Sequence, residues 1–248
     1  MDDVFSRFID ETKYPDLATP DQLRGKPKPP FELPVKKGQK IRKLPDPRAL
    51  PAKDLGINDI IERWEPGGFF HRSELTLDDL SYLLWCSQGV RIVVGDQVTI
   101  RNVYSCESIH PLETYCAVEA VEGLAEGLYR YLPLSHRLVL ERKDPDIAVH
   151  VAAACMNLPA VVSAAVTMIW CMVPYRGTWA LGRRGYRAAF LDCGHACQQL
   201  ICAAAAIGCG VRPIDLFHDD ALATVLGADT TVEQPVYCAA VGRLERLR

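Results

Sequence analysis

The chain has 248 residues, of which 49% are hydrophobic and 24% charged, and its formal net charge at pH 7 is −3. This composition excludes wholesale disorder, and the small net charge gives no general reason to expect nucleic acid or an anionic membrane as a partner. The start of the chain, Met1-Asp2-Asp3, lacks the basic flank and apolar run of a secretory signal. We therefore expect a cytoplasmic protein whose ten cysteines are reduced.

A proline-rich segment precedes the regular part of the chain. Residues 14–51 contain nine of the 17 prolines. Because proline removes backbone donors and blocks helix formation, we expect residues 1–54 to form an extended arm rather than a domain. Phe31, Leu33 and Val35 suggest that the arm packs along a larger body, and a solvated, disordered tail is the alternative. Residues 55–248 then form one domain.

From residue 55 onward the pattern becomes regular. Thr76 precedes an apolar-periodic stretch that Gly89 closes, which predicts a capped helix over residues 77–85. Further elements are expected in chain order: a hairpin over 91–101 with its turn at Gly95-Asp96, a strand over 114–121, a hairpin over 127–140, a buried strand ending near 173, a long helix ending at Gly208, a short helix over 219–226 and a strand over 236–241. Antiparallel hairpins with interspersed helices indicate an α+β layered domain rather than a doubly wound parallel sheet.

Residues 151–173 are nearly all apolar and could be mistaken for a membrane span. Asn157 and Pro159 interrupt the stretch, and no basic flank marks a cytoplasmic side. A short helix, a turn and a buried strand explain the pattern better, so we expect no membrane segment here.

The long helix is predicted to be amphipathic. Its buried stripe is expected to consist of Tyr186, Phe190, Cys193/Gly194, Cys197 and Ile201. Within it, Cys193, His195 and Cys197 invite a zinc interpretation. On a helix, however, the two cysteines share a face while His195 points about 200° away. We therefore expect no metal site unless ligands come from elsewhere.

The common phosphate-binding and nucleophile motifs are absent. There is no GxxxxGK[ST] sequence and no GxSxG sequence, and residues 182–185 (GRRG) lack the spacing of a dinucleotide fingerprint. Taken alone, His110 and His195 are better explained as structural than as catalytic residues.

Several segments, in this order and spacing, resemble those of the SagB-type dehydrogenases, a group within the nitroreductase-like, FMN-dependent family. They are residues 77–90 (LDDLSYLLWCSQGV), 110–115 (HPLETY), 121–124 (VEGL), 127–131 (GLYRY) and 185–195 (GYRAAFLDCGH). The resemblance implies a three-layer sandwich with a mainly antiparallel sheet, usually a homodimer with FMN at the subunit interface. It also implies hydride transfer between FMN and a peptide-derived heterocycle, such as a thiazoline, or another small substrate.

The resemblance also assigns site residues by position. The cofactor-binding residues would be Arg63 in a phosphate clamp, Ser105, His110 and Pro111 in a flavin-contacting loop, Gly208 and Gly210 in a glycine turn, and Arg243 near the C-terminal phosphate end. Tyr186 and Arg187 would be catalytic, because the family often places a tyrosine beside a basic residue there.

Four positions depart from the family pattern. Glu65 stands in the phosphate clamp, Glu107 replaces the glycine of a Pro-Ser-Ala-Gly loop, Asp215 stands in a turn expected to end in glycine, and Gln198-Gln199 replaces a Gln-Asn pair. The added carboxylates would repel the FMN phosphate, so we expect weak FMN binding. A flavin-free relative, acting as a pseudoenzyme partner or in a repurposed reaction, is the main alternative. A structural protein of unrelated fold is a further one.

Overall fold

The computed structural model describes residues 3–14, 18–51, 55–62, 69–71, 73–95 and 98–244. At its centre is an eight-stranded sheet in the order β1-β7-β6-β5-β8-β10-β2, with β9 pairing to β10, and all of these pairs are antiparallel. The strands are β1 (Ile41–Lys43), β2 (Phe70–His71), β5 (Leu112–Val118), β6 (Gly127–Leu132), β7 (Arg137–Lys143), β8 (Val166–Met172), β9 (Cys209–Ile214) and β10 (Gln234–Leu244). A separate hairpin is formed by β3 (Val90–Val94) and β4 (Val98–Arg101).

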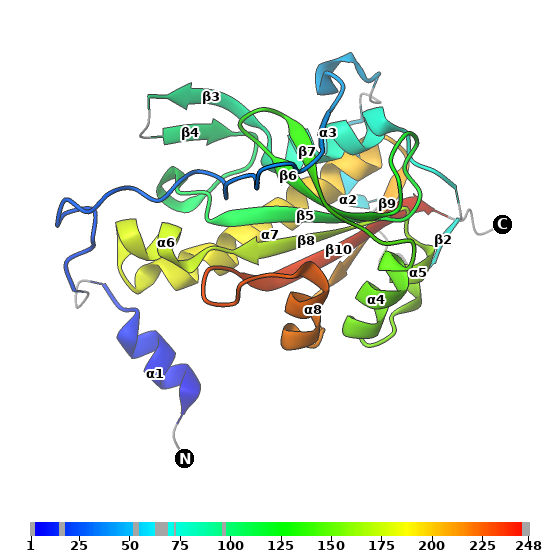
Figure 1. Cartoon of the computed structure of the whole chain (residues 1–248). Helices are drawn as coiled ribbons and strands as arrows, with labels where there is room; N and C mark the ends of the chain where they lie inside the picture. Colours follow the sequence, from blue (N-terminus) through cyan, green and yellow to red (C-terminus); the bar gives the residue numbers. More distant parts are fainter. Residues whose placement is uncertain are drawn as a thin grey trace.

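Helices cover both faces of the sheet (Figure 1). They are α1 (Val4–Glu11), α2 (Ile57–Glu62), α3 (Leu77–Gln88), α4 (Ile147–Ala154), α5 (Pro159–Ser163), α6 (Pro174–Leu181), α7 (Arg184–Ala206) and α8 (Asp219–Leu226). One hydrophobic core lies between the sheet and helices α3 and α7, and a second lies between the opposite face and helices α4, α5 and α8. The expected α+β architecture, with an antiparallel sheet between helical layers, is confirmed.

Helix α3 shows how local sequence starts an element. The Thr76 hydroxyl accepts a hydrogen bond from the Asp79 amide at 3.0 Å, and the Asp79 carboxylate accepts one from the Thr76 amide at 3.0 Å. This reciprocal capping box satisfies two helix-end donors. The helix ends at Gly89, as predicted.

Helix α7 buries part of the predicted stripe, since Cys193, Cys197 and Ile201 lie in the core as predicted. Tyr186 and Phe190 are 37% and 53% exposed, so the prediction of their burial was wrong. The cause is close packing by small residues, since a Cβ added to Gly185 would lie 2.3 Å from the carbonyl carbon of Gly177 in α6. Alanine and cysteine side chains of α7, such as Ala196, therefore lie in the core while the large side chains at these two positions point outward.

The apolar stretch over 151–173 folds into the end of α4, helix α5 and the buried strand β8. Within the part of the chain that the structure describes, no helix has the length and apolar character needed to cross a membrane. All ten cysteines are free thiols.

The N-terminal arm runs along the body of the protein (Figure 1). It begins with helix α1, which lies beside α7: the Glu11 carboxylate pairs with Arg183 at 2.7 Å. The arm then passes α6, crosses the sheet in an irregular, extended form, and adds β1 to the sheet edge, where Ile41 is opposite Val139 of β7. The segment predicted as an arm is thus docked on the body, and it contains a helix and a strand that the sequence patterns did not predict.

Candidate functional site

A loop between β4 and β5 is fastened to helix α7 by one buried carboxylate. Asp192, 4% exposed, accepts a hydrogen bond from the Ser105 hydroxyl at 2.6 Å and another from the Cys106 amide at 3.0 Å. Ser105 Oγ in turn accepts from the His110 amide at 2.8 Å. Burial raises the pKa of the Asp192 carboxyl group. These contacts bring the predicted residues Ser105 and His110 together, with Asp192 as the residue that positions them.

The same loop has an unusual backbone. Glu107, Ser108 and His110 have φ values of 52°, 55° and 50°, in the left-handed region that non-glycine residues rarely adopt. The His110 ring nitrogen Nε2 lies 3.2 Å from the Thr99 carbonyl, and burial lowers the pKa of His110 to about 3. The ring is therefore neutral at physiological pH. Pro111 ends the loop and accepts a hydrogen bond from the Val173 amide at 2.8 Å through its carbonyl.

A second group of predicted residues lies at the C-terminal end of α7. Arg243 contacts the Asp79 carboxylate at 2.6 Å and donates a hydrogen bond to the Ile207 carbonyl. Gly208 has φ +70°, which favours glycine, and Gly210 packs so closely on Leu244 that a Cβ would lie 2.2 Å from its Cδ2 atom. The charge of the Arg243 guanidinium is therefore already neutralised by Asp79, the acidic member of the α3 capping box.

A groove lies beside α7, and neither of these two groups lines it. It has a volume of about 500 Å³ and is lined by Ile60, Ile61, Gly194, Cys197, Gln198, Ile201, Cys202, Pro213 and Tyr237. Asp192 and Ile207 are about 22 Å apart along the helix axis at 1.5 Å per residue, and the groove residues of α7 lie between them. We call this feature the α7 groove.

The predicted catalytic pair lies elsewhere. Arg187 donates hydrogen bonds to the Thr12 hydroxyl and the Ile9 carbonyl, both at 2.5 Å, so its guanidinium holds helix α1. Tyr186 lines a shallow cavity beside α1 with Glu11. The structure thus places the pair at the docking site of α1 rather than in the α7 groove. Arg63, the predicted phosphate-clamp residue, lies outside the described residues, and so does Glu65.

The cysteine–histidine set on α7 does not form a metal site. Cys193 and Cys197 are buried, whereas His195 is partly exposed, with its ring packed edge-on against Tyr104 at a centroid distance of 5.2 Å. Over the described ranges there is no group of three His, Cys, Asp or Glu side chains that could hold a metal ion.

Sequence reasoning missed a cluster of buried charges on the other face of the sheet. Glu113 of β5, with its side chain 1% exposed, pairs with Arg130 of β6 at 3.1 Å and with Arg176 of α6 at 2.5 Å. Arg130 also pairs with Glu141 of β7 at 2.9 Å. The available signal was the presence of Glu113 and Arg130 inside strands whose other residues are mostly apolar, because unpaired charges are almost never fully buried.

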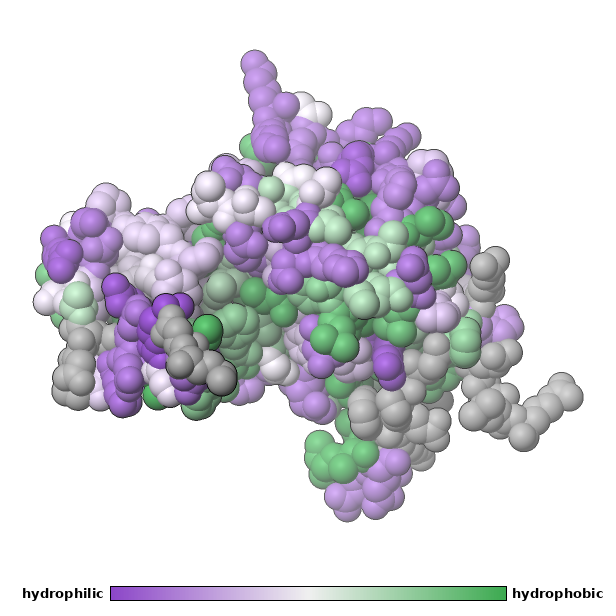
Figure 2. Space-filling view, turned by 90° about the horizontal axis from the view of Figure 1, so that it is seen from below, coloured by the Kyte–Doolittle hydropathy of each residue, from purple (hydrophilic) through white to green (hydrophobic). Residues whose placement is uncertain are grey.

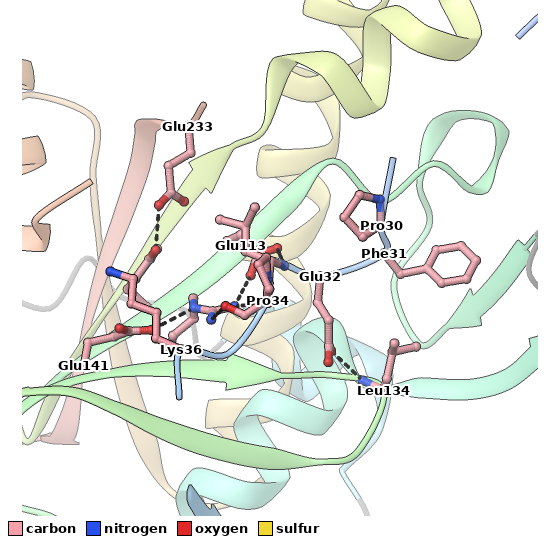
Figure 3. A network of polar contacts seen from close by, with 12 residues as sticks. Pro30, Phe31, Glu32, Pro34, Lys36, Glu113, Leu134, Glu141 and Glu233 are labelled. Carbon is pink, nitrogen blue, oxygen red and sulfur yellow. Dashed lines mark hydrogen bonds and ion pairs between the residues drawn. The ribbon is translucent and has the colours of Figure 1, made fainter. Parts of the chain in front are cut away.

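This cluster holds the N-terminal arm by its backbone (Figure 3). Four arm carbonyls accept hydrogen bonds from buried arginines: Pro30 from Arg176 at 2.8 Å, Phe31 from Arg101 at 3.4 Å, and Leu33 and Pro34 from Arg130 at 2.9 and 3.1 Å. The Leu33 amide donates to Glu113 at 2.8 Å. At this point the backbone of the arm is therefore hydrogen-bonded to the body of the protein as part of its fold.

A comparison with protein-family models identifies the family to which this chain belongs. The family model described as "Nitroreductase family" matches residues 69–243, which include the sheet from β2 to β10 together with α3 and α7. The chain belongs to the nitroreductase family. A protein of Methanocaldococcus jannaschii named "Putative nitroreductase" is 27% identical over 191 residues, which cover 77% of this chain and 92% of the relative.

Solved structures agree with this family fold. A chain from Anabaena variabilis described as a "putative nitroreductase" is 26% identical with a TM-score of 0.65, over 75% of this chain but only 37% of that longer one. A chain of the E. coli microcin synthetase McbBCD complex, with truncated pro-MccB17 bound, has a TM-score of 0.64 at 17% identity, over 96% of this chain and 86% of that one.

The α7 groove suits one part of a flavin better than the other. Its walls are largely apolar, and Gln198 and Tyr237 add polar groups that a flat ring system could contact. Among its described lining residues there is no cationic side chain, and Arg243 of β10, which does not line it, pairs with Asp79. Burial, together with neighbouring Cys197 and Asp215, raises the pKa of Tyr237 to about 12, which places a carboxylate close to the groove. The described lining residues thus fit the ring and offer no cation for the phosphate.

Proposed function

We propose that this chain is an oxidoreductase of the nitroreductase family that uses FMN held weakly in the α7 groove. The observation that carries the proposal is the groove itself, whose largely apolar lining comes from α2, α7, β9 and β10 and suits a flat ring system. When bound, the flavin would supply hydride transfer. The chain would supply the apolar walls that exclude water and the fixed loop that orients the reactants.

The proposed roles follow from the contacts. Ser105 and Asp192 hold the loop rigid, and His110, kept neutral by burial, adds a polar ring without adding charge. Pro213 and Tyr237 would contact the ring system from the strands of the sheet. Asp79 competes with the FMN phosphate for Arg243, so the phosphate gains little from that arginine. This competition is the reason for weak binding.

Two structural neighbours support the choice of cofactor and substrate. One, from Staphylococcus epidermidis with a TM-score of 0.57, is described as an NAD(P)H:FMN oxidoreductase. The other is the microcin synthetase chain, whose complex contains truncated pro-MccB17. Both are below 25% identity and establish only the fold for this chain. They favour FMN as the cofactor and a peptide-derived heterocycle, or another small molecule, as the substrate.

We also infer a homodimer that forms through α7. Phe190 and Leu191 of α7 are 53% and 58% exposed, which is unusual for large apolar side chains on a helix that borders a groove. The view in Figure 2 shows further apolar residues gathered in the middle of one face of the molecule. A second copy packed on α7 would cover Phe190 and Leu191 and close the groove.

A flavin-free role is the second candidate, and the Arg243–Asp79 pair is the observation that favours it. If the pair is permanent, the fold keeps the groove but has lost its phosphate contact there. The protein would then act as a partner of a modifying enzyme or in a different reaction.

Calorimetry with FMN separates the two candidates. We expect the wild type to bind with a dissociation constant above about 10 μM. Asp79→Asn, which removes the charge that occupies Arg243, should tighten binding at least tenfold. Asp78→Asn is the matched control, because it removes an exposed charge from the same helical turn without contacting Arg243. Sub-micromolar binding by the wild type would contradict the competition by Asp79, and no binding by any of the three proteins would favour the flavin-free role.

Activity is tested separately with added FMN. A thiazoline-containing peptide should be oxidised to the thiazole when excess FMN is present as the electron acceptor. Asp79→Asn should reach half-maximal rate at a lower FMN concentration than Asp78→Asn. A rate that does not depend on FMN would exclude the proposed chemistry.

A further inference from the structure

Helix α1 presents an apolar end that the body of the protein does not cover. Its last turn is held on α7 by Arg183 and Arg187. At the opposite end, Val4 and Phe5 are 66% and 69% exposed, and no residue from Val4 to Glu11 is buried. The helix projects from the body in Figure 1. Large apolar side chains left in water at this end favour contact with another surface.

The carboxylates of α1 and its cap are already engaged within the chain. Asp3 caps the first turn by accepting a hydrogen bond from the Phe5 amide at 3.0 Å. Asp10 pairs with Lys13 at 2.5 Å, and Glu11 pairs with Arg183 at 2.7 Å. The free face of α1 is therefore the apolar one, and the partner that fits it is an apolar protein surface.

The β3–β4 hairpin presents a second uncovered apolar face. In its antiparallel register Ile92 lies opposite Ile100 and Val94 lies opposite Val98, so these four β-branched side chains share one face. Ile92, Val94 and Ile100 are 53%, 51% and 37% exposed. Among the described residues no third strand joins this hairpin. A two-stranded hairpin is marginally stable in water unless its hydrophobic face packs against another element.

The exposed face of α7 connects these two elements. Arg187, Leu191 and His195 follow at intervals of four residues, so they lie along one side of the helix. Arg187 holds α1, and the His195 ring packs edge-on against Tyr104, which is 67% exposed. The short turn η2 (Cys106–Ser108) contacts both α7 and β4. Leu191 therefore lies midway between the end of α7 that holds α1 and the part beside the hairpin.

The charges on α7 favour one way of packing a second copy on this face. Arg183, Arg184 and Arg187 lie at its N-terminal end, and among the described residues only Arg183 has a carboxylate partner. A two-fold axis parallel to α7 would bring these arginines against the same three of the second copy and would align the two helix dipoles. A two-fold axis perpendicular to α7 avoids both, and it makes the two α7 helices antiparallel.

An antiparallel contact brings α1 of one copy to the hairpin of the other. With Leu191 at its centre, Arg187 lies opposite His195 of the partner subunit, since each is four residues, or about 6 Å, from Leu191 along the helix. We propose that, in the homodimer inferred above, α1 of each copy packs its apolar end on Tyr104 and the β3–β4 hairpin of the other copy. The inference rests on that homodimer.

The area of the α7 contact supports these additional contacts. A whole aromatic side chain buries about 150–250 Å², and Phe190 and Leu191 are each only about half exposed. These two side chains therefore cover far less than the roughly 800 Å² that each partner contributes to a stable interface. Two reciprocal contacts between α1 and the hairpin add apolar area on both sides of the two-fold axis.

Light scattering on the full chain over a range of concentrations tests the contact. Phe5→Asp and Ile92→Asp each place a charge in the apolar contact and should raise the dimer dissociation constant at least tenfold. Val149→Asp is the matched control and should leave the constant unchanged. Val149 is 57% exposed but lies on α4, on the opposite face of the sheet from α7. Circular dichroism verifies that each variant is folded.

A charge-swap variant shows whether the two elements meet. Phe5→Asp combined with Ile92→Lys should dimerise more tightly than either single variant, because an aspartate then faces a lysine in both reciprocal contacts. Phe5→Asp combined with Val149→Lys should remain as weak as Phe5→Asp.

Three outcomes would overturn the proposal. Failure of the charge swap to restore dimerisation would show that α1 and the hairpin do not meet. A dimer that tolerates Phe5→Asp but is lost in Phe190→Asp would leave the α7 contact standing without the contribution of α1. A monomeric wild type would remove both contacts. The calorimetry with FMN described above tests the flavin proposal separately from all three.

Discussion

The Asp192 carboxylate accepts a hydrogen bond from the Ser105 hydroxyl at 2.6 Å, although the two residues are 87 positions apart in sequence. Both groups are buried. Ser105 Oγ is at the same time the acceptor for the His110 amide. The Ser105 side chain therefore connects the middle of helix α7 to the far end of the loop between β4 and β5. The left-handed backbone at Glu107 and Ser108 is retained because these contacts over-determine the loop.

Removing the Ser105 hydroxyl should destabilise the protein. Ser105→Ala leaves the Asp192 carboxylate with one loop donor fewer and the His110 amide without its acceptor, so we expect a loss of about 1–3 kcal/mol in the free energy of unfolding. Urea denaturation measures the loss. Ser108→Ala is the control, because Ser108 belongs to the same loop but makes no side-chain hydrogen bond with any described residue. Equal stability of the two variants would contradict the anchoring role of Asp192.

His110 should make the protein less stable as the pH falls. Burial, and then the charge of Arg101, lowers its pKa to about 3 from the ordinary value of 6.5. Between these values the unfolded chain takes up a proton that the folded chain does not. The stability contributed by the neutral ring is therefore complete above about pH 6.5 and is lost as the pH falls toward 3, by at most about 1.4 kcal/mol per pH unit.

The variant His110→Asn isolates this effect, because asparagine tolerates the left-handed backbone at this position. The difference in free energy of unfolding between wild type and His110→Asn should shrink steadily from pH 7 to pH 4. His218→Asn, at an exposed histidine, should leave the pH profile unchanged. Parallel profiles for wild type and His110→Asn would show that the ring is protonated in the folded state.

The cysteines should react in two classes. Cys86, Cys106 and Cys202 are half-buried and the other seven are buried, and burial raises the pKa of Cys86 and Cys106. In the native protein a thiol reagent should modify at most these three residues quickly. In denaturant without reductant it should modify all ten. A lower total, with a mass loss of two hydrogens per missing pair, would reveal disulfides and contradict the expected reducing compartment.

The exposed apolar residues of α7 predict a dimer. Light scattering should give about twice the chain mass of 27.5 kDa at micromolar concentration. Phe190→Asp should shift the protein to the monomer, since it places a charge in the proposed contact. Leu23→Asp serves as the control, because Leu23 is 76% exposed but lies on the arm. A monomeric wild type, or a dimer that tolerates Phe190→Asp, would exclude this contact.

Local patterns were sufficient for most of the secondary structure. The capping box at Thr76 and Asp79 joins residues three apart, and the strands of the β6–β7 hairpin pair through a short turn. Such elements depend on neighbours in sequence, so their periodicity and end signals identify them. The same reasoning identified Cys193, Cys197 and Ile201 as buried but failed for Tyr186 and Phe190. Their end of α7 packs on α6 through the close approach of Gly177 and Gly185.

The sequence by itself determined the family resemblance, the α+β class and the positions of the main elements, all of which depend on local residue patterns. The tertiary structure alone decided which charged groups meet. Arg243 pairs with Asp79 across 164 residues, Arg187 holds α1 instead of the groove, and Arg176 shares Glu113 with Arg130 beneath the arm. A buried charge takes its role from the partner that neutralises it, and that partner is chosen by the packing of distant segments rather than by sequence neighbours.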